Sequence, residues 1–322
     1  MYRRSLMGFG AAAGLLPRAS RAQSSFPSKQ LRLLVGAAPG GGADIVARIM
    51  AQEMNRSGGL SVMVDNKPGA GGALAAREML RVPADGHTIM VANVGVLAII
   101  PYATRDAGYD PRTDIAPVCL AVDFSNLLVV HPGVPARTLA EYLALARRPE
   151  GMDYGTSGVG SAGHLAGELL KALSGARLNH VPFRGGGPAM NDLVGGHVPS
   201  LFASAPTATA FVRDGRIRAL AATGARRSAF DPDIPTIAES GFPGYAATNW
   251  YAVVVSSRTA PGIVATLNAI LNKALGAAEV RAAYRQQGME TLAGTSDEAA
   301  AHIARETDIW KKVIADAGMR LE

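Results

Sequence analysis

The segment GTSGVGSAGH (residues 155–164) contains the spacing G-x-G-x-x-G. Glycines at a strand–helix junction let backbone N–H groups approach an anion closely, and the positive end of the helix dipole favours negative charge. Dinucleotide binding also needs an acidic residue about 20 residues further on, at the end of the next strand. That strand, LNHVPF, ends in Phe183 and Arg184 without an acid. The pattern therefore predicts an anion site and disfavours NAD, whereas Arg184 leaves a 2′-phosphate, and hence NADP, open.

Two more junctions of this kind occur, AAPGGGAD (37–44) and FRGGGPA (183–189), together with the shorter NVG (93–95). For one such loop alone, a tight strand–helix turn would be the favoured interpretation. Three loops at the carboxyl ends of strands instead favour a ligand with one or two carboxylates. Asp44 is expected either to cap the first helix or to hold its loop in shape.

The polar side chains of the 155–164 loop do not form a recognisable catalytic or metal site. Neither Ser157 nor Ser161 has glycines at both −2 and +2, as a nucleophile elbow requires. His164 and Glu168 have the i, i+4 spacing of a metal-binding pair, but a surface pair or a histidine that hydrogen-bonds the loop is favoured. We interpret Thr156, Ser157 and Ser161 as hydroxyl donors to a bound oxyanion.

These loops must be positioned by alternating strands and helices, which is typical of an α/β protein with mostly parallel sheets flanked by helices. The pattern predicts two lobes with a ligand cleft between them. Residues 23–127 plus 250–322 form lobe 1, residues 128–249 form lobe 2, and 224–249 is loop. The expected strands are 31–37, 61–66, 87–93, 116–122, 127–132, 152–157, 178–183, 199–204, 218–223 and 250–256.

The first 22 residues resemble an export signal. Arg3 and Arg4 precede a short apolar run (6–16), and SRA ending at Ala22 is a small-x-small cleavage site. The run is shorter than the roughly 20 apolar residues that span a bilayer. The arginine pair suggests the twin-arginine route, although ordinary secretion stays open.

Charge and cysteine content exclude several classes of protein. Removal of residues 1–22, which hold four arginines and no acid, lowers the formal charge from +6 to +2. This balance disfavours nucleic-acid binding. The single cysteine, Cys119, excludes an internal disulfide and a cysteine metal cage.

Seven motifs in order make the chain resemble the periplasmic solute-binding receptors of tripartite tricarboxylate transporters, the Bug-type receptors. They are APGGGAD, VDNKPGAGG, PADGHTIM, YGTSGVGSAGHLAGELL, VPFRGGGPAMNDLVGGHV, GRIRALAATGARR and DIPTIAESGFPG. The resemblance implies a type II-like periplasmic binding protein fold whose lobes close on a carboxylate, which is then delivered to a membrane permease. It implies a periplasmic receptor without catalytic residues, metal or cofactor, and we expect a monomer.

Carried over by motif, the resemblance places a set of ligand-binding residues around the cleft. They are Ala38, Pro39, Gly40, Gly41, Gly42, Asp44, Asn93, Thr156, Ser157, Gly160, Ser161, His164, Phe183, Arg184 and Gly185. The alternatives left open are an exported enzyme that uses residues 155–163 for a phosphate or dinucleotide, and a receptor that signals to a membrane sensor.

Three positions depart from the family pattern. Ala37 replaces the usual Phe, Phe183 replaces a Tyr, and the segment 202–210 lacks the usual acidic residue. These changes enlarge the cleft, remove a hydroxyl and weaken the attraction for an amino group. We therefore hypothesise a larger or less polar carboxylate than an amino acid or a simple dicarboxylate.

Overall fold

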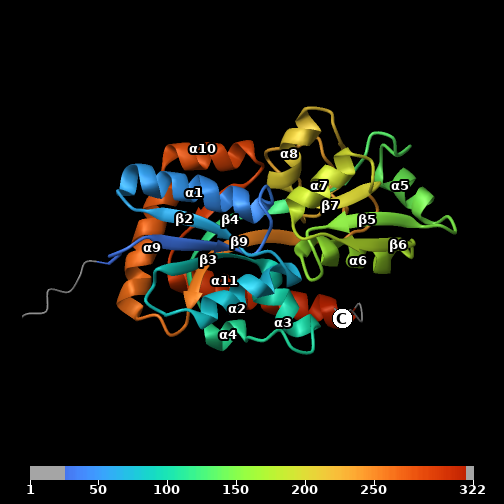
Figure 1. Cartoon of the computed structure of the whole chain (residues 1–322). Coiled ribbons are helices and arrows are strands. Elements are labelled where there is room, and N and C mark those ends of the chain that lie inside the picture. Colours follow the sequence, from blue (N-terminus) through green and yellow to red (C-terminus); the bar gives the residue numbers. More distant parts are fainter. Residues whose placement is uncertain (1–25, 317–322) are drawn as a thin grey trace, which may run out of the picture.

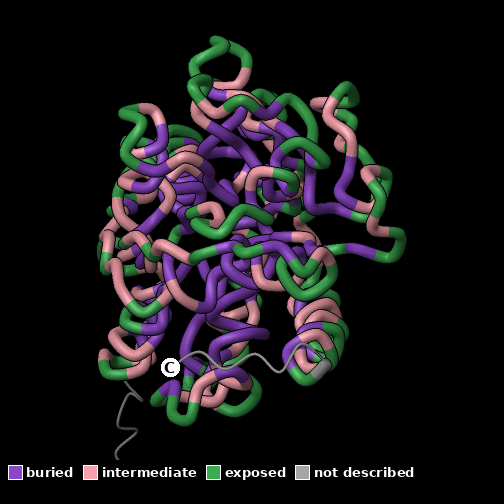
Figure 2. The backbone as a smooth tube through the Cα atoms, turned by 90° about the vertical axis from the view of Figure 1, so that its right-hand side faces the viewer, coloured by how far each residue is buried: buried purple, intermediate pink, exposed green. Residues whose placement is uncertain are grey.

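The computed structural model describes residues 26–316 as two α/β lobes that lie side by side (Figure 1). The predicted signal peptide, residues 1–22, lies outside the described residues. Buried stretches run through the interior of the molecule, and the exposed segments lie mainly at its periphery (Figure 2). The expected two-lobed α/β fold is confirmed.

The sheet of lobe 1 has the strand order β2-β1-β3-β9-β4, with β10 added to β4. The β1–β2 and β1–β3 pairs are parallel, and the other pairs are antiparallel. Helices α1, α9 and α10 pack in one apolar cluster with this sheet, and α2 and α11 pack in another. The elements are β1 (Leu31–Val35), α1 (Gly42–Gly58), β2 (Val62–Asn66), η1 (Ala70–Gly72), α2 (Ala73–Arg81), β3 (Thr88–Asn93), η2 (Gly95–Ile99), α3 (Ile100–Ala103), α4 (Pro111–Asp114), β4 (Ile115–Val130), β9 (Thr248–Ser256), α9 (Pro261–Gly276), α10 (Ala278–Gln286), β10 (Glu290–Ala293) and α11 (Ser296–Asp316).

The sheet of lobe 2 continues from β4 in the order β4-β7-β5-β6, with β8 also paired to β4. Strand β5 is parallel to β6 and β7, and β4 is antiparallel to β7 and β8. Helices α7 and α8 pack on one apolar cluster, and α5 and α6 contribute to another. The elements are α5 (Leu139–Ala146), β5 (Met152–Thr156), α6 (Ala162–Ser174), β6 (Leu178–Pro182), α7 (Gly186–Val194), β7 (Ser200–Ser204), α8 (Ala205–Arg213) and β8 (Arg218–Ala222).

Strand β4 connects the lobes and differs from the sequence prediction. The sequence predicts two strands, 116–122 and 127–132, because the polar residues DFSN separate two apolar runs. The structure has one strand of 16 residues, which pairs with β9 up to Ser125 and with β7 from Asn126. Because β4 and β9 run antiparallel to their neighbours, each sheet is mixed where mostly parallel sheets were expected. The exact lobe boundaries at 127/128 and 249/250 stay a prediction.

Several elements escaped the sequence prediction. Helix α8 begins in APTATA, where Pro206 resembles a loop signal but occupies the first turn of a helix, a position that tolerates proline. The elements η2, α3, α4, α10 and β10 were also missed. The segment 224–249 is loop up to the start of β9, as expected, with one isolated bridge between Ala222 and Thr236.

No single helix in residues 26–316 is long and apolar enough to cross a membrane. Helices α9 and α10 together have the length and apolar composition of a membrane span, but they meet at a bend of 67°. Leu267, Leu271 and Tyr284 of this pair are fully buried in the core of lobe 1.

Candidate ligand-binding site

A small cavity of about 40 Å³ lies where residues of both lobes meet. A water molecule needs about 10–15 Å³, so the cavity has room for about three waters or a ligand fragment of similar size. No lining side chain is charged. Lobe 1 contributes Gly36, Ala37, Gly42, Ala43, Gly71, Asn93 and Tyr251; lobe 2 contributes Ser157, Ser161, Ala162, Gly163, Gly186, Leu201, Phe202, Ala203 and Ser204; and Asn126 and Asn249 lie on the strands that connect the lobes.

The first turns of four helices line this cavity. Gly42 begins α1, Ala162 begins α6, Gly186 begins α7, and Ser204 is the N-cap of α8. Among the described residues, the N–H groups of the first two residues of α1 and of α6 donate to no protein acceptor. The free N–H groups of α1 and α6, and the positive ends of all four helices, favour an anion in a cavity without any cationic side chain.

Asp44 holds the loop before α1. Its carboxylate accepts hydrogen bonds from Gly40 N (2.9 Å), Arg48 Nε (2.9 Å) and Asn66 Nδ2 (2.9 Å). Burial by itself would raise the pKa of Asp44, but these hydrogen bonds, led by that from Arg48, outweigh it and lower the pKa. The N-cap is Gly41, which has no side-chain cap, so Asp44 acts by shaping the loop.

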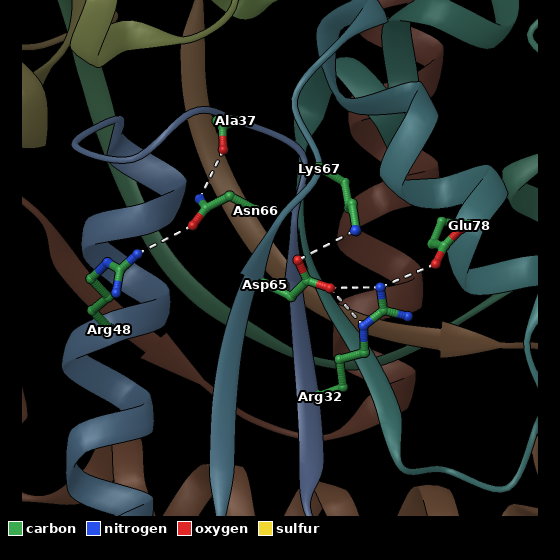
Figure 3. A network of polar contacts seen from close by, with 7 residues as sticks. All are labelled: Arg32, Ala37, Arg48, Asp65, Asn66, Lys67 and Glu78. Carbon is green, nitrogen blue, oxygen red and sulfur yellow. Dashed lines mark hydrogen bonds and ion pairs between the residues drawn. The ribbon is translucent and has the colours of Figure 1, made fainter.

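A polar network supports the same loop from the edge of the sheet (Figure 3). Asn66 Nδ2 also donates to the carbonyl of Ala37 (2.9 Å), and Arg48 Nη2 donates to Asn66 Oδ1 (3.2 Å). Beyond Asn66, Arg32 bridges Asp65 and the side chain of Glu78 on α2, and Lys67 pairs with Asp65. The network ties β1, β2 and α2 to the loop that faces the cavity.

His164 holds the loop before α6. Its Nδ1 accepts from Gly160 N (3.2 Å), and its own N–H donates to the N-cap Ser161 Oγ (3.2 Å). The ring stacks on His180 with a centroid distance of 3.8 Å, and His180 Nε2 bonds Thr156 Oγ1 (2.7 Å). Burial is the main cause that lowers the pKa of both histidines, that of His180 to about 3. The favoured interpretation of His164, a histidine bonded to the loop, agrees with this geometry.

Glu168 does not face His164 as a metal partner in this structure. Its carboxylate accepts from Tyr154 Oη (2.7 Å) and pairs with Lys171 (3.4 Å). Within residues 26–316, no cluster of three or more His, Cys, Asp or Glu side chains is arranged to hold a metal ion.

The loop 183–186 of lobe 2 contacts lobe 1 through its backbone. Ala38 N in lobe 1 donates to the carbonyl of Arg184 (3.2 Å), whose side chain is exposed. Phe183 is partly buried against the apolar core of lobe 2 and does not line the cavity. A Cβ on Gly185 would lie 2.8 Å from Ala38 N, so only a glycine permits this approach.

Other glycines bring the lobes into equally close contact. A Cβ on Gly71 would lie 2.5 Å from the Val159 carbonyl oxygen, and one on Gly187 would lie 2.5 Å from that of Pro39. A Cβ on Gly95 would lie 2.6 Å from the Gly160 carbonyl oxygen. Real Cβ atoms do not approach so closely, so these glycines permit the closed arrangement around the cavity.

The predicted site residues fall into two groups. Gly42, Asn93, Ser157 and Ser161 line the cavity. Ala38, Pro39, Gly40, Gly41, Asp44, Thr156, Gly160, His164, Phe183, Arg184 and Gly185 lie behind the lining or at the lobe contact, where several of their N–H groups already have protein acceptors. Contact of either group with a ligand stays a prediction.

Sequence reasoning missed Asn126, Asn249, Ser204 and Tyr251 in the lining. Asn126 and Asn249 lie on the strands that connect the lobes, beside the boundaries predicted at 127/128 and 249/250. Their position could have indicated a role in the site, because a ligand cleft between two lobes lies next to the segments where the chain crosses from one lobe to the other.

The fold and this cavity define a two-lobed solute-binding protein. Residues 46–319 match the family described as "Tripartite tricarboxylate transporter family receptor". The chain is 32% identical to Protein BugT of Bordetella pertussis over 98% of this chain and 96% of that protein. It therefore belongs to the tripartite tricarboxylate transporter receptor family, as its motifs predicted.

Solved structures agree with this assignment. "R. palustris Rpa4515 with adipate" has a TM-score of 0.88 and 35% identity, covering 92% of this chain and 99% of that one. MatC (Rpa3494) from Rhodopseudomonas palustris with bound malate has a TM-score of 0.86 and 29% identity, covering 90% and 100%. The comparisons give no support to the enzyme alternative.

Proposed function

We propose that this chain captures a small molecule through a carboxylate in the cavity between its lobes and delivers it to a tripartite tricarboxylate-type permease. The observation that carries the proposal is the convergence of four helix N-termini on one cavity, two of them with free N–H groups. The adipate and malate in the related structures are carboxylates, which supports the same ligand class.

The cavity lining refines the hypothesis about the ligand. Ala37, where the family pattern has Phe, lines the cavity, and the lining segment 201–204 contains no acid. With no carboxylate to meet it, an ammonium group would face four positive helix ends, so amino acids are disfavoured. The volume of about 40 Å³ gives no support to the idea of an enlarged pocket.

The cellular setting is part of the proposal. We infer that residues 1–22 direct export and are removed, and that the mature receptor works in the periplasm as a monomer. Its role is binding without catalysis, because the lining offers hydroxyls, amides and helix ends but no acid–base pair.

Thermal shift and calorimetry on residues 23–322 test the proposal. The panel holds adipate, malate, benzoate, aspartate, NAD and NADP, with adipamide as the uncharged match of adipate. A ligand at 100 times its Kd should add about 2.7 kcal/mol of stability. We expect a shift with one carboxylate class and none with adipamide or the nucleotides. A shift in melting temperature with NADP alone would show that the G-x-G-x-x-G loop binds a dinucleotide. If no ligand of the panel shifted the melting temperature, the proposal would be overturned.

A further inference from the structure

Two asparagines on the strands that connect the lobes form a buried amide pair in the cavity. Asn126 lies on β4 and Asn249 on β9, and their side chains are joined by one hydrogen bond of 3.1 Å from Asn249 Nδ2 to Asn126 Oδ1. The residues are 1% and 6% exposed. Thr223 fixes the backbone of Asn126 through Asn126 N to Thr223 Oγ1 (3.0 Å) and Thr223 N to Asn126 O (2.9 Å).

The amide pair leaves two buried polar atoms without a protein partner, Asn126 Nδ2 and Asn249 Oδ1. Both residues line the cavity. A buried donor and a buried acceptor without partners are unfavourable unless a ligand or water satisfies them. One amide–amide bond always leaves one free NH₂ group and one free carbonyl on the pair, whichever residue donates.

We propose that this amide pair is a second polar subsite that selects a carboxylate carrying a hydroxyl group. The hydroxyl would donate to Asn249 Oδ1 and accept from Asn126 Nδ2, so both orphaned atoms would be satisfied by one neutral group. This inference rests on the proposed function, since the helix N-termini would hold the carboxylate of the same ligand.

Other groups fit the amide pair less well. A second carboxylate would accept from Asn126 Nδ2, but it would also face the acceptor Asn249 Oδ1 with no proton to share. An ammonium group would satisfy Asn249 Oδ1 but would leave Asn126 Nδ2 unpaired, and no lining acid would balance its charge. An alkyl group would leave both atoms unpaired.

Matched ligand pairs on the wild-type protein give the first test, because they need no variant. Calorimetry would compare malate with succinate, and 2-hydroxyadipate with adipate. We expect at least one hydroxylated acid to bind about tenfold or more tightly than its match, since a site built for a hydroxyl rejects the analogue that lacks it.

Substitution gives the second test. In Asn249→Leu, which is close in size and has no acceptor, the ratio of affinities for the hydroxylated and the unhydroxylated acid should fall to about twofold or less. Asn179→Leu is the control, because the exposed amide of Asn179 donates to Asp153 and Glu150 outside the cavity. Circular dichroism and thermal melting verify that each variant is folded.

The outcomes separate the two proposals. If no carboxylate binds the wild type, the proposed function fails. If carboxylates bind equally with and without a hydroxyl, the proposed function stands and the amide-pair subsite is overturned. A hydroxyl preference that survives in Asn249→Leu also overturns it, because some other group then recognises the hydroxyl.

Discussion

The loops before α1 and α6 have the same geometry but are held by different chemistry. Gly40 and Gly160 have φ values of +77° and +76°, and each is followed by an extended N-cap residue. In both loops the third helical residue accepts a hydrogen bond from that glycine, Asp44 from Gly40 and His164 from Gly160. The two lobes thus present matched helix N-termini to one cavity.

The difference between the loops lies in charge. Asp44 is ionised and held by Arg48 and Asn66, whereas His164 is neutral and stacks on His180. One glycine N–H can therefore be fixed by a carboxylate or by an imidazole, provided that the third helical residue supplies an acceptor. The loops should accordingly respond differently to substitution and to pH.

The largest effect is expected when each loop is pushed away from its contact in the opposite lobe. Gly187→Ala would place a methyl group 2.5 Å from Pro39 O in the first loop, and Gly95→Ala would place one 2.6 Å from Gly160 O in the second. Overpacking of about 1–3 kcal/mol corresponds to roughly a fivefold to 150-fold loss of ligand affinity. Calorimetry measures the loss.

Gly262→Ala is the matched control for these glycines, because a Cβ there has nothing within 4 Å. It should leave affinity unchanged. Wild-type affinity in both Gly187→Ala and Gly95→Ala would show that ligand binding does not depend on these contacts between the lobes.

The next effect concerns the charged loop. Asp44→Ala removes a buried acceptor from Gly40, Arg48 and Asn66 and should lower the free energy of unfolding by about 2–3 kcal/mol. Asp44→Asn keeps an acceptor oxygen and should cost less. Urea denaturation measures both against Asp233→Ala, a substitution at an exposed position. If Asp44→Ala and Asp233→Ala lowered the free energy of unfolding equally, Asp44 would not stabilise the loop.

The neutral loop predicts a pH dependence. Burial lowers the pKa of His164 and lowers that of His180 to about 3, so the unfolded chain binds protons more readily than the native one. The stability from these histidines is therefore complete above about 6.5 and is lost as the pH falls toward the folded values, at up to about 1.4 kcal/mol per pH unit for each. The lowered pKa of Asp44 affects the stability of the fold only at pH values near or below the ordinary pKa of 3.8.

Thermal melting between pH 7.5 and 5 checks this difference. His180→Gln should flatten the pH profile of the melting temperature, whereas Asp44→Asn should leave its slope in this window unchanged. An unaltered slope in His180→Gln would show that another group controls the acid response.

The smallest effect is expected at Phe183. Its ring packs against the core of lobe 2 and does not line the cavity, so Phe183→Tyr should change affinity by no more than about twofold. A tenfold gain in affinity in the same calorimetric assay would place the restored hydroxyl in the binding site.

Local sequence patterns predicted most of the fold. Strands β1, β3, β5 and β6 lie where the sequence predicted them, and helices α1 and α6 follow the glycine junctions from which they were expected. The glycine junctions correctly predicted the turns before α1, α6 and α7, because residues with positive φ at such turns are mostly glycines. Helix α8 was missed because its proline and threonines resemble a loop when neighbours in space are ignored.

The sequence by itself determined the α/β alternation, the anion-binding junctions and the family, since these depend on neighbouring residues and motif order. Only the tertiary structure decided that β4 is one strand through both sheets, because its pairing partners β7 and β9 are distant in the chain. It also decided which polar residues surround the cavity. Asn126 and Asn249 are 123 positions apart, and their amides meet only when the connecting strands lie side by side.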